Sequence, residues 1–184
     1  MSEETIERPE AIISFWQEAG PQRWFVREVA FDETIRSRFL RTHEKAAAGA
    51  SVDWAKEPQG TLALLLLLDQ FPRNMFRGEA RAFATDAQAR AIANVAIARG
   101  DDLAVPPALR SFFYLPLMHS EDIRDQERCV VLCQAARNPD GLRYAVIHAE
   151  AIRRFGRFPH RNTALSRPTT AAEQAYLDAD GFKG

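Results

Sequence analysis

The stretch TLALLLLLDQFPRN, Thr61 to Asn74, decides the fold class of this chain. Its apolar run covers residues 62–68 and falls far short of the roughly 20 residues that span a bilayer. The stretch lacks the alternation of apolar and polar residues that is typical of a half-buried strand. We therefore expect an apolar helix from about Pro58. It should end before Pro72, because the residue before a proline avoids the α region.

On either side of this stretch, prolines, glycines and capping residues mark the starts and ends of further helices. Pro9 is suited to the first turn of one helix, and Gly20 to the end of that helix. Another helix should begin at Thr85 and end at Gly100, and the spacing of Thr85 and Gln88 predicts a capping box at its start. The remaining helices are expected over residues 32–48, 108–114, 121–137 and 142–155 and from Thr170 onward, with Asp32, Ser120 and Thr170 as caps and Asn138 to Gly141 as a turn. The prediction is an all-α protein of about eight helices packed as antiparallel pairs. It forms a single domain, residues 1–184, with short flexible ends.

Composition excludes several classes of function. With 24 basic and 25 acidic residues, nothing in the charge favours nucleic acid or an anionic membrane. The acidic start MSEETIERPE lacks the form of a signal peptide, so a cytoplasmic location is the default expectation. Cys129 and Cys133 share one helix face, where a disulfide is rare, and we expect them to be small packing residues.

The polar residues after the apolar run are the first candidates for ligand binding. Asp69 follows seven apolar residues at a helix end, where a carboxylate is unfavourable, so it needs a cationic partner: Arg73, Arg77, Arg157 or Arg161. Arginine pairs with carboxylate or phosphate, and asparagine both donates and accepts. We therefore assign Asp69, Arg73, Asn74 and Arg77 to a ligand site. The alternatives are a buried ion pair that fixes the loop, and a solvated loop.

A second stretch, FGRFPHRN from Phe155 to Asn162, repeats this combination of Phe-Pro with basic and amide side chains. Gly156 can take the left-handed conformation that ends a helix. Arg157, Arg161 and Asn162 are assigned to the same ligand site, which we expect to be a hollow shared by the two stretches.

Three histidines are candidates for acid–base catalysis, because imidazole titrates near neutrality. His160 belongs to the second stretch. His119 precedes a helix start, where the alternatives are a cap or an ordinary exposed side chain. His148 falls inside an apolar helical arc, so the alternative there is a core histidine.

The familiar motifs of metal sites, phosphate loops and nucleophile elbows are missing from the sequence. We expect no metal ion and no cofactor, and the sequence leaves open whether the protein is an enzyme.

The chain resembles a bacterial family known as domain of unknown function 924. The matching stretches are FW at Phe15–Trp16, LLLLDQFPRNMFRG at Leu65–Gly78, AFATDAQAR at Ala82–Arg90, FFYLPLMHSEDIRDQER at Phe112–Arg128, and FGRFPHRN. The resemblance implies an all-helical fold similar to tetratricopeptide-like arrays of helix pairs, and it supplies no reaction.

Two hypotheses follow for the function. The first is a polar pocket of Arg, His, Asp and Asn side chains that binds a small anionic compound, a carboxylate or phosphate, with acid–base catalysis left open. The second is a tetratricopeptide-like module that binds a peptide or protein without catalysis. The sequence does not indicate an oligomeric state.

Overall fold

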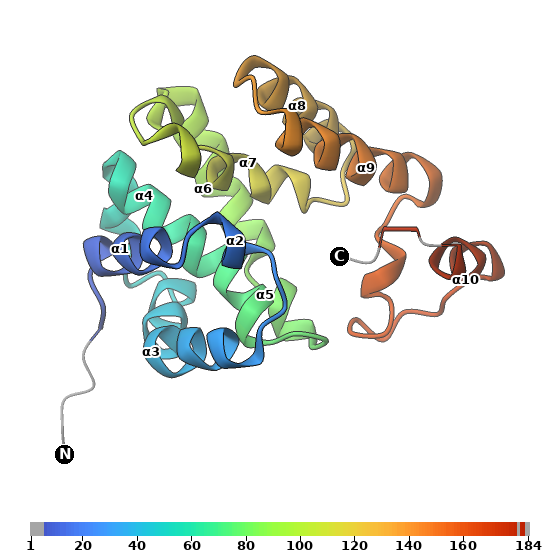
Figure 1. The fold of residues 1–184 in the computed structure, drawn as a ribbon, viewed down its shortest axis with the longest axis horizontal. Coiled ribbons are helices and arrows are strands. Elements are labelled where there is room, and N and C mark those ends of the chain that lie inside the picture. Colours follow the sequence, from blue (N-terminus) through green and yellow to red (C-terminus); the bar gives the residue numbers. More distant parts are fainter. Residues whose placement is uncertain (1–5, 180, 183–184) are drawn as a thin grey trace. The chain divides into compact units, whose positions relative to one another are not determined.

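The computed structural model describes residues 6–179 and 181–182, and all regular structure in this part of the chain is helical (Figure 1). The α-helices are α1 (Pro9–Ala19), α2 (Pro21–Trp24), α3 (Val29–Ala47), α4 (Pro58–Leu65), α5 (Phe71–Met75), α6 (Asp86–Arg99), α7 (Ser111–Met118), α8 (Ile123–Ala135), α9 (Pro139–Phe155) and α10 (Ala171–Asp178). Short helices of other types are η1 (Val52–Lys56), η2 (Leu66–Gln70), η3 (Ala80–Phe83), η4 (Asp101–Leu103), η5 (Pro107–Leu109) and η6 (Pro159–Arg161). The prediction of an all-α protein is confirmed.

The chain divides into two compact units. Unit 1 comprises Met1–Arg77 and Arg81–Phe113, and unit 2 comprises Gly78–Ala80 and Tyr114–Gly184. That residues 1–184 form a single domain stays a prediction. The predicted flexible ends fall largely on residues 1–5, 180 and 183–184, which lie outside the described part of the chain.

Unit 1 is built around a cluster of aromatic side chains. Helix α1 packs on α4, α3 on α5, and α4 on α6. Trp16, Phe39 and Phe71 are fully buried, and the ring centroids of Phe39 and Phe71 lie 5.0 Å apart. The indole Nε1 of Trp24 donates a 2.7 Å hydrogen bond to the carbonyl of Trp16, which ties α2 to α1. This core holds the helix that carries Asp69 and Arg73.

The helix through the apolar run does not end before Pro72, contrary to prediction. Between α4 and α5 the segment η2 is a π-helix, and the N–H of Phe71 reaches back five residues to the carbonyl of Leu66. In the π-helical register, where each N–H reaches back five residues, the carbonyl of Leu67 faces the nitrogen of residue 72. In the α-helical register, where each N–H reaches back four residues, the carbonyl of Leu68 would face that nitrogen. Pro72 has no N–H, so it offers a hydrogen bond to neither carbonyl.

Side chains from elsewhere in unit 1 supply the missing donors. Nδ1 of His43 lies 2.8 Å from the Leu67 carbonyl, and the Thr85 hydroxyl donates a 2.5 Å hydrogen bond to the Leu68 carbonyl. A carbonyl oxygen only accepts, so Nδ1 of His43 carries the proton. Burial lowers the pKa of His43, although the hydrogen bond to Leu67 acts in the opposite direction. The helix therefore continues through a proline because tertiary contacts satisfy its backbone.

Several predicted helix caps are corrected by the same kind of contact. Thr85 precedes α6 but its hydroxyl makes no capping hydrogen bond, so the predicted capping box is wrong. Asp122, and not Ser120, caps α8, because its carboxylate accepts from the N–H of Arg124. Asn138 caps α9, so this helix begins at Pro139 and the predicted turn forms its first residues.

Two helix bounds differ from the prediction, and three predicted helix ends or caps are confirmed. Helix α3 begins at Val29, which places Asp32 in its first turn and not at its cap. Helix α7 continues past Pro116, which removes a single backbone donor from it. The left-handed ends at Gly100 and Gly156 and the capping box opened by Thr170 are confirmed.

Unit 2 contains one clear antiparallel helix pair. Helices α8 and α9 pack along each other and are joined by residues 136–138 (Figure 1). Cys129 and Cys133 are buried free thiols on α8 with their sulfur atoms 4.0 Å apart, which confirms their expected role as packing residues. The segment η6 follows α9 and packs against α10.

Candidate functional site

The partner of Asp69 is Arg73, one helical turn away. Asp69 is buried, and its Oδ1 lies 3.3 Å from Nη1 of Arg73. The same guanidinium donates two hydrogen bonds of 2.8 Å to the carboxylate of Asp86. Burial lowers the pKa of Arg73, but attraction by Asp69 and then by Asp86 outweighs burial and raises the pKa above its ordinary value. Arg73 is thus a fixed cation between two carboxylates.

Asn74 and Arg77 meet at Asp32. Nδ2 of Asn74 donates to Oδ1 of Asp32 at 2.8 Å, and Nε of Arg77 donates to Oδ2 at 2.6 Å. The side-chain oxygen of Asn74 accepts from Gln70 at 3.0 Å. The polar groups of the first stretch therefore bind acids and amides of their own unit, which is the arrangement of the structural alternative. Their role in ligand binding stays a prediction.

Arg157 and Asn162 share Glu173 in unit 2. Arg157 donates to both carboxylate oxygens of Glu173, at 2.6 and 2.9 Å, and Nδ2 of Asn162 lies 3.4 Å from one of them. These bonds are charge-assisted and bidentate, a strong class of hydrogen bond. The hydrogen bond from Arg157, followed by those from Thr170, lowers the pKa of Glu173 to about 2. Arg157 anchors η6 and its neighbouring loop to α10.

Arg161 is directed toward the histidines. It is 5% exposed, and its Nη2 donates a 3.0 Å hydrogen bond to the backbone carbonyl of His119. Its guanidinium carbon lies 4.5 Å from the centroid of the Phe158 ring, within the range of a cation–π contact. Arg161 therefore connects the start of α8 with η6.

The three predicted histidines come together in unit 2. The rings of His119 and His148 have centroids 6.2 Å apart, and the rings of His148 and His160 each lie 5.5 Å from the ring of Phe158. We call His119, His148, His160, Phe158 and Arg161 the histidine cluster. Nδ1 of His148 donates a 2.7 Å hydrogen bond to the Tyr144 carbonyl, so its Nε2 is the nitrogen that can exchange a proton.

Two residues of these surroundings were not predicted from the sequence. His43 holds the π-helix, and its spacing from Phe39 and Ala46 placed it on the buried face of α3. Phe182 packs on His148 with ring centroids 4.0 Å apart. The contact between Phe182 and His148 has no local signal in the sequence, because the two residues lie on segments that are distant in the sequence.

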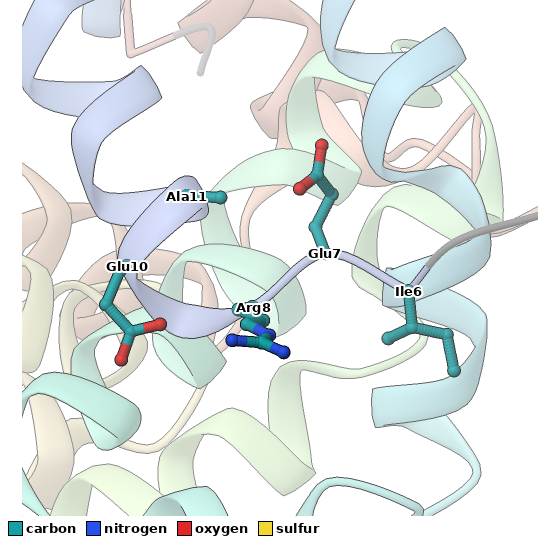
Figure 2. A pocket seen from close by; sticks show the side chains of 5 residues that line it. All are labelled: Ile6, Glu7, Arg8, Glu10 and Ala11. Atoms are coloured by element: carbon teal, nitrogen blue, oxygen red, sulfur yellow. The ribbon is translucent and has the colours of Figure 1, made fainter.

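Two hollows in the described part of the chain are lined by none of the ten predicted site residues. The first, of about 500 Å³, is lined by Ile6, Glu7, Arg8, Glu10 and Ala11 (Figure 2). Figure 2 shows these residues on the extended segment before α1 and on its first turn, and Glu7 also pairs with Arg38 at 2.7 Å. The second hollow, of about 360 Å³, is lined by Cys133, Gln134, Arg137, Asn138, Pro139 and Leu142. Neither gathers groups of one charge.

No group of three or more His, Cys, Asp or Glu side chains in residues 6–179 and 181–182 is placed to hold a metal ion. Within the same ranges, no helix combines the length and apolar character needed to cross a membrane.

One family model and one solved structure match most of the chain. The model of "Bacterial protein of unknown function (DUF924)" matches residues 12–181. A solved structure described as a protein of unknown function, ATU0120 from Agrobacterium tumefaciens, is 47% identical to this chain. The similarity covers 93% of this chain and 97% of that one, with a TM-score of 0.90. None of the curated proteins compared matches this chain.

Proposed function

The chain belongs to the DUF924 family of bacterial proteins of unknown function, and we propose that its histidine cluster binds a small carboxylate or phosphate compound. The observation that carries the proposal is the meeting of three imidazoles and one guanidinium, from positions up to about forty residues apart in the sequence: His148, His160 and Arg161 contact the Phe158 ring, and His119 contacts His148. Packing alone does not require this combination of polar rings.

Three of the other predicted arginines already bind carboxylates of the protein. Arg73, Arg77 and Arg157 each hold a carboxylate of the protein through short hydrogen bonds. An anionic ligand at any of them would have to replace that carboxylate and leave it without its partner, which is costly for the buried acids.

The cluster also offers acid–base chemistry. The hydrogen bond to Tyr144 fixes which nitrogen of His148 carries a proton, so Nε2 is the proton acceptor in the neutral ring. Arg161 would stabilise negative charge on the ligand. In this proposal His119, His148 and His160 are the acid–base groups for any reaction of the bound anion. Arg157 and Asn162 position η6, which carries His160 and Arg161.

The test is the thermal stability of the chain in inorganic phosphate and in acetate. A ligand that binds the folded state raises the melting temperature by mass action. We expect phosphate or acetate to stabilise the original chain and the control variant Arg153→Gln, whose side chain is half exposed on α9. His160→Gln and Arg161→Gln should lose that response. An equal response in all four proteins would refute this location of the site.

A second candidate is a tetratricopeptide-like module for peptides. It is favoured by the α8–α9 pair, which runs from Ile123 to Phe155 and so matches the length of a tetratricopeptide unit, about 34 residues. Val131 on this pair is 63% exposed and Tyr144 is 47% exposed, as expected of a contact surface. In this case a peptide selected against the chain should lose binding on Val131→Ser and keep it on His160→Gln.

A further inference from the structure

The two cysteines of the chain, Cys129 and Cys133, form a pair of free thiols in unit 2. They stand four residues apart on α8, both are buried, and their Sγ atoms lie 4.0 Å apart. The histidine cluster contains neither of them, so the proposed function leaves the pair unused. Thiolate sulfur is a ligand for soft metal ions, and two sulfur atoms this close can bind the same ion.

The spacing of the pair is too wide for a disulfide and suits a bridging ion. Residues four apart on a helix have Cβ atoms about 5–6 Å apart, whereas a disulfide needs about 3.5–4.5 Å. Two thiolates in line with one ion, at bonds of about 2.3 Å, have their sulfur atoms about 4.6 Å apart. The Sγ atoms of Cys129 and Cys133 are within about 0.6 Å of that separation, and a small rotation of the side chains covers the difference.

The number of ligands selects the kind of ion. No group of three or more His, Cys, Asp or Glu side chains comes together in residues 6–179 and 181–182, so the pair gains no third ligand of these types there. Zn²⁺ in structural sites takes four ligands. Cu(I) is a soft ion that thiolates select, and its filled d shell is satisfied by two of them in a line. The pair therefore fits Cu(I) better than Zn²⁺.

A hollow gives access to the pair from the junction of α8 and α9. Cys133 is one of the residues that line this hollow of about 360 Å³. The hydrogen bond with Cys129 lowers the pKa of Cys133 against the effect of burial, while the same contact, followed by burial, raises the pKa of Cys129. Cys133 thus loses its proton first, on the side from which an ion arrives. Arg137 lines the same hollow, and its charge partly offsets the single net negative charge of two thiolates with one Cu(I).

We propose that Cys129 and Cys133 are the two ligands of a Cu(I) site on α8. Binding forms two Cu–S bonds and releases the two thiol protons to solvent, with no change of oxidation state. The protons leave weak contacts, because the sulfur of Cys129 lies 3.6 Å from the Tyr114 carbonyl and thiols are weak donors. The site shares no residue with the histidine cluster and does not depend on the proposed function. The expectation of no metal ion came from motifs with three or four ligands, and a two-ligand site falls outside such motifs.

The first test measures the affinity of the full chain for Cu(I), without oxygen, by competition with the chelator bicinchoninate. It compares the original chain with Cys129→Ser, Cys133→Ser and the control Val131→Ser, which changes an exposed residue of the same helix and keeps both thiols. We expect the original chain and the control to bind one Cu(I) per chain with equal affinity. Each cysteine variant should bind about 10²–10⁴-fold more weakly, because the second of two linked ligands acts at a high effective concentration. Equal affinity in all four proteins would place the copper elsewhere and overturn the proposal.

Two further measurements use the original chain, so they do not depend on the folding of a variant. X-ray absorption of the copper-bound chain should show two sulfur neighbours, and a nitrogen neighbour would contradict a site made of these thiolates alone. Free Cu(I) buffered about a hundredfold above its dissociation constant should raise the melting temperature by about 5–10 °C. No rise, or a fall, would overturn a site built by the fold, since metal ions also bind unfolded cysteines. An equal rise with Zn²⁺ would refute the selection of Cu(I).

Discussion

Replacing Thr85 by valine tests whether tertiary contacts hold the helix through Pro72. The substitution keeps the shape of the side chain and removes the hydroxyl that donates to the Leu68 carbonyl at 2.5 Å. Thr85 is 8% exposed and Leu68 is fully buried, so water has little access to this carbonyl. Pro72, four residues on, has no N–H to replace the lost donor.

The expected loss follows from the desolvation of an unpaired group. A buried acceptor without a partner costs about 1–3 kcal/mol, so we expect the free energy of unfolding to fall by about 2 kcal/mol. For a chain of this length each kcal/mol shifts the melting temperature by about 2–4 °C, which gives a decrease of about 4–8 °C. Urea denaturation monitored by circular dichroism measures the first quantity, and thermal denaturation the second.

Two further variants make the reasoning refutable. Thr34→Val is a matched control, because the exposed Thr34 hydroxyl donates to a carbonyl inside α3 whose own helix supplies a backbone donor; we expect a change below about 0.5 kcal/mol. Adding Pro72→Ala to Thr85→Val restores an N–H at position 72 and should recover part of the loss. A loss below about 0.5 kcal/mol in Thr85→Val, or no recovery in the double variant, would show that Leu68 finds another donor.

Three other predictions concern ion pairs and caps. Arg73→Met removes the cation that pairs with Asp69 and Asp86, and should lower the free energy of unfolding by about 3–5 kcal/mol in urea denaturation; a loss below about 1 kcal/mol would contradict a buried pair. The pKa of Glu173 lies at about 2, below its ordinary value of 4.5, so its contribution to stability is complete above pH 4.5 and is lost as the pH falls toward 2. Glu173→Gln should therefore lower the melting temperature most at neutral pH and least near pH 2, and a pH-independent difference would exclude this linkage. Asn138→Ala removes the cap of α9 and should cost about 1 kcal/mol, measured in the same way.

Local chemistry made part of the fold predictable. Gly100 and Gly156 end their helices in the left-handed conformation, and Thr170 forms a capping box with Glu173, as their positions in the sequence indicated. Each of these features depends on residues within one turn. The errors arose where a side chain bonds to a distant backbone group, as Thr85 does with Leu68 and His43 with Leu67.

The candidate site was predictable in its residue types but not in its pairing. The need of Asp69 for a cation was clear from burial at a helix end, yet only the fold selects Arg73 among four arginines. The meeting of His119, His148 and His160 depends on how the segments before α8, within α9 and in η6 are packed within unit 2. Spacing in the sequence carries no information on such packing.

The π-helical segment η2 also affects how this chain can change length. A π-helical turn holds one residue more than an α-helical turn, so deletion of a single residue from Leu66–Gln70 would restore an ordinary helix. The residues that follow would keep their orientation, whereas the same deletion from an ordinary α-helix would rotate them by about 100° about the helix axis. Arg73 would still face Asp86, and Asn74 would still face Asp32. The π-helical turn thus accommodates one additional residue without changing the rotational phase of the Phe-Pro-Arg-Asn stretch.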